Sequence, residues 1–105
     1  MNEIPSTEQQ QIIGEWMVSQ IEQDDKRYCI EELKEVFFDD DSILEKVKTA
    51  AISTQMAVEI LNRYFNLFIT SGLLKPIKGT KYYRKLNKKE MKEIYTQYSK
   101  TIEIS

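Results

Sequence analysis

The side chains in this chain that are best suited to bind a ligand are the lysines and arginines that follow residue 72. Residues 72–92 contain eight basic residues and one acidic residue, Glu90, so the segment has a net charge of +7. Clustered amines and guanidinium groups bind phosphate oxygens, which predicts an anionic partner. Alternatively, these charges could have no ligand and simply keep the hairpin solvated, which prevents other strands from pairing with its edges. The candidate phosphate contacts are Lys75, Lys78, Lys81, Arg84, Lys85, Lys88 and Lys89.

The N-terminal part of the chain has the opposite charge. Residues 1–45 carry 13 acidic and 3 basic residues, a net of −10, so the overall charge of −2 hides a strong asymmetry. An acidic surface of this kind could bind a basic protein partner or mimic nucleic acid, as in small phage or plasmid inhibitors and adaptors, by analogy only. This protein-interaction hypothesis is the alternative to nucleic-acid binding. Its candidate residues are Glu22, Asp24, Asp25, Glu31, Glu32, Glu35, Asp39, Asp40 and Asp41.

Catalytic and metal sites have little support in the sequence. The chain has no histidine and one cysteine, Cys29, so the usual zinc sites and Cys–His or Ser–His pairs cannot be built from it. The run of three aspartates at 39–41 lacks the alternating spacing and turn glycine of a calcium loop. We therefore expect no enzyme activity, no cofactor and no metal, and we expect Cys29 to be a small buried hydrophobe.

Length and hydropathy predict a single domain over residues 1–105. No run approaches the roughly 20 apolar residues of a membrane helix, and the N-terminus lacks the layout of a signal peptide. We therefore expect a cytoplasmic, intracellular protein with no membrane association. Apolar periodicity and capping residues predict helices at about 7–23, 30–38, 42–51 and 53–70, a hairpin at about 73–86 and a C-terminal helix at about 88–100.

Local signals mark where these elements begin and end. We expect N-caps at Ser6 (with Gln9), Ser42 (with Glu45), Ser53 and Asn87 (with Glu90). Gly72 is expected to have a positive φ after the 53–70 helix, and a glycine turn is expected in the hairpin. Residues 28–30 could form a short strand. The apolar side of the 53–70 helix comprises Met56, Ala57, Ile60, Leu61, Tyr64, Phe65, Leu67 and Phe68.

The segment ILEKVKTAAISTQMAVEIL, residues 43–61, resembles a helix-turn-helix. A first helix ends in Ala50 and Ala51, Ile52 plugs the turn, and Ser53 caps the second helix. The following SGLLKPIKGTKYYRKL resembles the hairpin of winged helix-turn-helix proteins. The glycine often found in the turn between the two helices of a helix-turn-helix is absent here. The resemblance, over residues 43–86, implies a mainly α fold with a small β-hairpin wing.

This resemblance implies a protein that binds duplex DNA, most simply a transcriptional regulator. The 53–63 face of the 53–70 helix would lie in the major groove, where glutamine and asparagine pair with adenine, arginine with guanine, and glutamate with cytosine. The wing would contact phosphates. A solvated polar surface is the plain alternative for the helix face. The candidate base-reading residues are Thr54, Gln55, Glu59, Asn62 and Arg63.

Two packing questions stay open in the sequence. Tyr82 and Tyr83 alternate along a strand, so one should enter the core and the other should face outward. The apolar stripe of the last helix either packs on the first helix or pairs with a second subunit. In the second case, a homodimer would form through Trp16, Met17, Met91, Ile94, Tyr95 and Tyr98.

Overall fold

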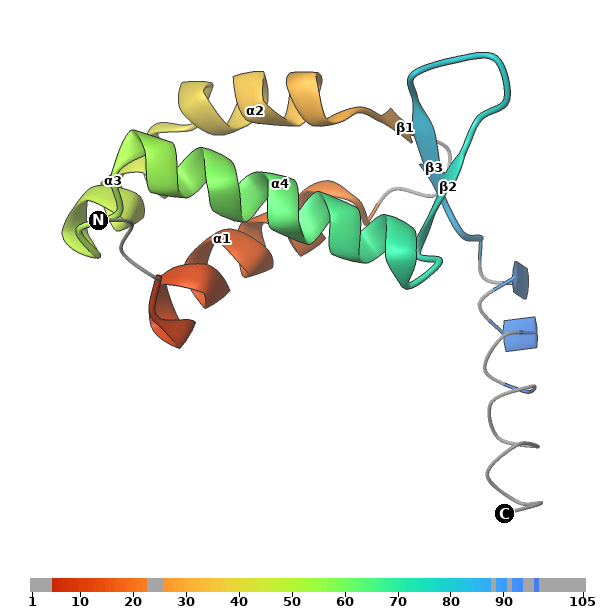
Figure 1. Cartoon of the computed structure of the whole chain (residues 1–105), viewed down its shortest axis with the longest axis horizontal. Helices are drawn as coiled ribbons and strands as arrows, with labels where there is room; N and C mark the ends of the chain where they lie inside the picture. Colours follow the sequence, from red (N-terminus) through yellow and green to blue (C-terminus); the bar gives the residue numbers. More distant parts are fainter. Residues whose placement is uncertain (1–4, 23–25, 88, 91, 94–95, 97–105) are drawn as a thin grey trace.

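The computed structural model describes residues 5–22, 26–87, 89–90, 92–93 and 96. Within them, α4 crosses the middle of the molecule between α1 and α2, and a small sheet lies at its C-terminal end (Figure 1). No helix among these residues is long and apolar enough to span a membrane. The elements are α1 (Thr7–Gln20), β1 (Arg27–Tyr28), α2 (Ile30–Asp39), α3 (Asp41–Thr49), α4 (Thr54–Thr70), β2 (Leu74–Pro76) and β3 (Tyr83–Lys85).

Two helix starts agree with the capping predictions. The Ser6 hydroxyl accepts the Gln9 N–H at 3.2 Å, and Gln9 Oε1 accepts the Ser6 N–H at 2.9 Å, which completes a capping box. The Ser53 hydroxyl accepts the Met56 N–H at 3.1 Å at the start of α4. α1 ends at Gln20, before the predicted residue 23. The Ile21 N–H donates a bifurcated hydrogen bond to the carbonyls of Met17 and Val18, and Ile21 is the C-cap of the helix.

The predicted start of α3 is wrong. Asp40, not Ser42, is its N-cap, and the Asp40 carboxylate accepts the N–H groups of Ser42 and Ile43 at 3.1 and 3.2 Å. Asp40 has the extended backbone of a cap, whereas Ser42 already lies inside the helix. α2 ends at Asp39 and α3 begins at Asp41, so Asp40 alone separates the two helices.

The turn between α3 and α4 contains a backbone conformation that favours glycine, although the residue there is an alanine. Ala51 has a φ of 58°, in the left-handed region. This conformation turns the chain so that Ile52 is buried and its N–H reaches the Val47 carbonyl at 3.0 Å. Ile52 therefore plugs the turn as predicted.

α4 is the central element of the core. Ala57, Ile60 and Leu61 have no exposed surface, and both α1 and α2 pack on this helix. Leu67 is 55% exposed, so its predicted place on the buried side is wrong. Periodicity gives the side of a helix, whereas burial also depends on how far the neighbouring helices extend along it.

The sheet is antiparallel with the order β1-β3-β2. The short strand lies at Arg27–Tyr28, not at the predicted residues 28–30, because Cys29 caps α2 and Ile30 begins it, and this strand pairs with the hairpin. In one row across the sheet, Tyr28, Tyr83 and Pro76 are in register. Tyr28 is buried, and Tyr83 packs edge-on against Phe65 with ring centroids 5.4 Å apart, so this row faces the core. Gly72 and Gly79 have the expected positive φ, 85° and 80°. The fold is mainly helical with a small three-stranded sheet.

Candidate nucleic-acid interface

A row of three cations crosses the outer face of the sheet. Arg27 on β1 is in register with Arg84 on β3, and Arg84 is in register with Lys75 on β2. Side chains alternate along strands, so this row faces away from the core that Tyr28 and Tyr83 enter. Sequence reasoning missed Arg27, because only the pairing of β1 with β3 brings it beside the hairpin. The short strand predicted at residues 28–30, directly after Arg27, was the one signal that pointed to this region.

Glu90 is paired with two members of this row, and its single charge balances one of their two positive charges. Arg84 Nη1 and Nη2 donate to Glu90 Oε1 and Oε2 at 2.7 and 3.1 Å, and Lys75 Nζ lies 3.7 Å from Oε2. The pKa of Glu90 is lowered to about 2, mainly by the hydrogen bonds from Arg84 and to a smaller extent by the hydrogen bond from the Asn87 N–H. The same contact raises the pKa of Arg84. Lys75 and Arg84, expected as free phosphate contacts, are thus paired with a carboxylate of the same chain.

Tyr82 is the outward-facing tyrosine, and it connects the hairpin to α2. The Arg27 guanidinium lies 4.3 Å from the centre of its ring. Its hydroxyl donates to Glu32 Oε1 at 2.8 Å, a bond that raises the pKa of Tyr82. Lys81 Nζ lies 5.7 Å from the same ring. These contacts hold the hairpin loop against the N-terminal end of α2.

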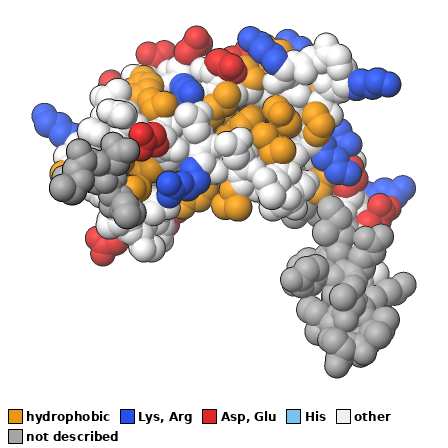
Figure 2. All heavy atoms as spheres, viewed as in Figure 1, with side chains coloured by type: hydrophobic (Ala, Val, Ile, Leu, Met, Phe, Trp, Pro, Cys, Tyr) orange, Lys and Arg blue, Asp and Glu red, His pale blue; other side chains and the backbone are white. Residues whose placement is uncertain are grey.

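The remaining predicted phosphate contacts differ in their surroundings. Lys78, Lys81 and Lys89 are exposed, whereas Lys85 is partly buried and donates to the Glu22 carbonyl at 3.1 Å. Lys88 lies outside the described residues. Figure 2 shows several basic side chains at the end of the molecule that carries the sheet, others elsewhere on the same face, and acidic side chains over α2.

The predicted base-reading residues lie on the surface of α4. Thr54, Gln55, Glu59 and Arg63 are exposed, and Asn62 is partly buried. α4 has 17 residues and is therefore about 25 Å long. The sheet lies at its C-terminal end, so the first turn of α4 and the cation row form two separate parts of the candidate interface (Figure 1).

Three acidic residues form a row along α2. Glu31, Glu35 and Asp39 are exposed at four-residue spacing along α2. Val36 and Phe38, 47% and 37% exposed, flank this acidic row on the two sides of the helix. Asp24 and Asp25 lie outside the described residues.

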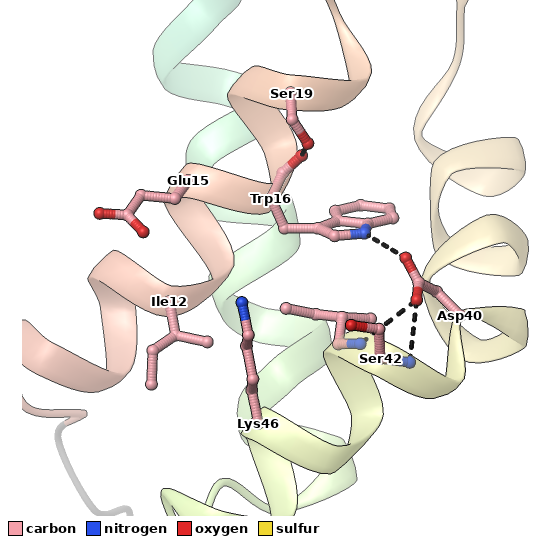
Figure 3. Close-up of a pocket in the computed structure, with 8 residues that line it drawn as sticks. Ile12, Glu15, Trp16, Ser19, Asp40, Ser42 and Lys46 are labelled. Atoms are coloured by element: carbon pink, nitrogen blue, oxygen red, sulfur yellow. Dashed lines mark hydrogen bonds between the residues drawn. The ribbon is translucent and has the colours of Figure 1, made fainter.

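Asp40 has an internal role instead. Its Oδ2 accepts the Trp16 indole N–H at 3.0 Å, which, together with the capping N–H groups, lowers its pKa. These groups line a hollow of about 270 Å³ between α1 and α3 that also includes Lys46 (Figure 3). Both Asp40 oxygens are already hydrogen-bonded, and no nucleophile is paired with a base among these lining residues. Among the described residues, no three His, Cys, Asp or Glu side chains converge to hold a metal ion.

Two residues of the proposed dimer surface are not on the surface. Trp16 and Met17 are buried within the chain, and the Trp16 ring meets Phe37 edge-on at 5.1 Å. This part of the dimer prediction is wrong, because α3 and α4 cover the apolar side of α1. Met91, Ile94, Tyr95 and Tyr98 lie outside the described residues, as does most of the predicted C-terminal helix. The Asn87 cap at its start is present, with the Glu90 N–H donating to Asn87 Oδ1 at 2.8 Å.

No family model, curated protein or solved structure matches this chain. The functional assignment therefore rests on the side chains described above.

Proposed function

We propose that this chain is a winged-helix protein that binds duplex DNA, most simply as a transcriptional regulator. The observation that carries the proposal is the row of Arg27, Arg84 and Lys75 on the outer face of the sheet, whose hairpin directly follows α4. The α3–α4 pair joined by a tight turn supports it. So does the sheet order, because a short strand between the first two helices commonly pairs with the hairpin in winged-helix folds.

The two parts of the interface would make different contacts. The polar side of α4 enters the major groove, where Gln55 and Asn62 suit adenine and Arg63 suits guanine. Lys78, in the hairpin loop, and the cations of the sheet hold the phosphates beside it. The acidic row on α2 repels the duplex, so it favours approach by α4 and the sheet.

Fluorescence anisotropy with random-sequence duplex DNA tests this proposal. We expect binding at about 50 mM salt that weakens steeply as salt rises. Lys78→Gln should weaken binding and lower the salt slope by about one unit, because one phosphate contact is lost. Lys34→Gln, the same charge change on α2, should leave the slope unchanged. Failure of the unmodified protein to bind at about 50 mM salt would overturn the proposal.

A second candidate function is supported by the α2 surface. Glu31, Glu35 and Asp39 form an acidic row with exposed apolar side chains on both sides, which suits a basic amphipathic segment of another protein. A peptide of alternating lysine and leucine is a suitable probe. Neutralising Glu31, Glu35 and Asp39 together should weaken its binding more than neutralising Glu8, Glu15 and Glu45, which are exposed elsewhere. Equal effects would exclude this surface.

A further inference from the structure

The Glu90 carboxylate is the meeting point of four hydrogen-bond or ion-pair donors. Arg84 supplies two N–H groups at 2.7 and 3.1 Å, and Lys75 supplies its ammonium group at 3.7 Å. The backbone N–H of Asn87 donates to Oε1 at 3.2 Å. Donors from β2, from β3 and from the chain that follows β3 thus surround one anion.

An anion between Lys75 and Arg84 reduces their mutual repulsion. They are direct partners across β2 and β3, and like charges at such positions repel. Arg27 extends the same row on the other side of Arg84. The carboxylate of Glu90 supplies the missing negative charge, so the sheet holds its cations together with the help of a residue outside it.

The cations remain open to a second anion. The side chains of Lys75 and Arg84 are 48% and 44% exposed, whereas that of Glu90 is 22% exposed. A phosphate offers arginine the same two-oxygen geometry as a carboxylate, and it carries its charge on more oxygens. An incoming phosphate can therefore reach both cations from solvent.

We propose that Lys75, Arg84 and the Asn87 N–H form a phosphate site that Glu90 occupies in the free protein. The inference rests on the proposed function for its natural ligand, a phosphate of the DNA backbone. Binding exchanges the Glu90 contacts for phosphate contacts, so Glu90 lowers the affinity of the wing for any anion. The exchange also links DNA binding to the chain that begins at Asn87, because Glu90 belongs to the capping box there.

Glu90→Gln isolates the charge from the cap. Glutamine at this position retains the capping-box hydrogen bond, so the helix start is preserved while the ion pair is removed. The matched control is Glu93→Gln, which removes the same charge from an exposed residue one turn further on. Circular dichroism first checks that both variants are folded.

Two measurements decide the proposal. In duplex anisotropy, Glu90→Gln should bind about two- to fivefold more tightly than Glu93→Gln, the size expected for release of an exposed ion pair. In an NMR titration with pyrophosphate, the Asn87 amide should shift at lower concentration in Glu90→Gln than in the unmodified protein. Adding Arg84→Gln to Glu90→Gln should abolish that shift.

The outcomes separate this inference from the proposed function. Equal duplex affinities for the two variants, with an Asn87 amide that ignores pyrophosphate, would overturn the phosphate site and leave DNA binding intact. A pyrophosphate response without duplex binding by any variant would support the site and overturn the proposed function.

Discussion

The ring of Tyr64 on α4 lies directly over Gly14 on α1. A Cβ at residue 14 would be 2.6 Å from Tyr64 Cζ and 2.7 Å from its hydroxyl oxygen, well inside contact distance. This explains a glycine inside a helix, where it costs about 1 kcal/mol relative to alanine. The absent side chain allows the two helices to pack with a tyrosine between them.

Gly14→Ala should therefore fail to stabilise the protein. The helix gains about 1 kcal/mol in propensity, but the new methyl group must displace the Tyr64 ring. In a Tyr64→Ala background the same substitution should deliver the gain. Denaturant unfolding of the four proteins in a double-mutant cycle measures the coupling. Additive effects would show that the ring moves aside without cost.

Ala51→Gly should stabilise the α3–α4 turn. Alanine in the left-handed region costs about 1–2 kcal/mol, and the extra entropy of glycine in the unfolded chain offsets part of that gain. We expect a net increase of about 0.5–1 kcal/mol in the free energy of unfolding. Ala50→Gly is the control, because Ala50 has a φ of −83° and should lose stability. Loss of stability at both positions would contradict the strain at Ala51.

Asp40 should matter more for stability than its neighbours. Asp40→Ala removes the cap of α3 and leaves the Trp16 indole N–H unpaired, so we expect a lower melting temperature and altered tryptophan fluorescence. Asp40→Asn keeps an acceptor for the cap and should cost less. Asp39→Ala, on the exposed face of α2, is the control and should leave the fluorescence unchanged.

Arg27 should contribute to DNA binding although it lies far from the hairpin in the sequence. Arg27→Gln is expected to lower the salt slope of duplex binding by about one unit. Lys26→Gln changes the same charge one residue away, where alternation directs the side chain to the other face of β1, and Lys26 Nζ lies 5.9 Å from the Tyr28 ring centre. The two variants should therefore differ. Equal slopes would remove the cation row from the interface.

The Glu90–Arg84 pair should make the stability of the folded protein depend on pH in the acidic range. The folded pKa of Glu90, about 2, is below its ordinary value of 4.5, so its contribution is present above pH 4.5. The contribution is lost as pH falls from 4.5 to about 2. The melting temperature of the unmodified protein should exceed that of Glu90→Gln at pH 6, and the difference should vanish near pH 2. A carbon NMR titration of Glu90 with a midpoint near 4.5 would contradict the pairing.

Local signals were enough to predict most of the elements. The Ser6 and Ser53 caps, the positive φ of Gly72 and the apolar side of α4 depend on residues within one or two turns of each other. The start of α3 was missed because Asp40 and Ser42 are both good capping residues. Only the short link between α2 and α3 decides in favour of Asp40.

The candidate site depended much more on tertiary structure. The sequence by itself determined a basic hairpin after a long amphipathic helix, and an acidic half before it. Only the tertiary structure placed Arg27 beside Arg84, put Glu90 between Arg84 and Lys75, and buried Trp16 and Met17 within the chain. Periodicity determines which residues share one face of an element. Which element covers that face, and which charges are paired, depends on how the elements pack against each other, and a pattern within one element does not encode that packing.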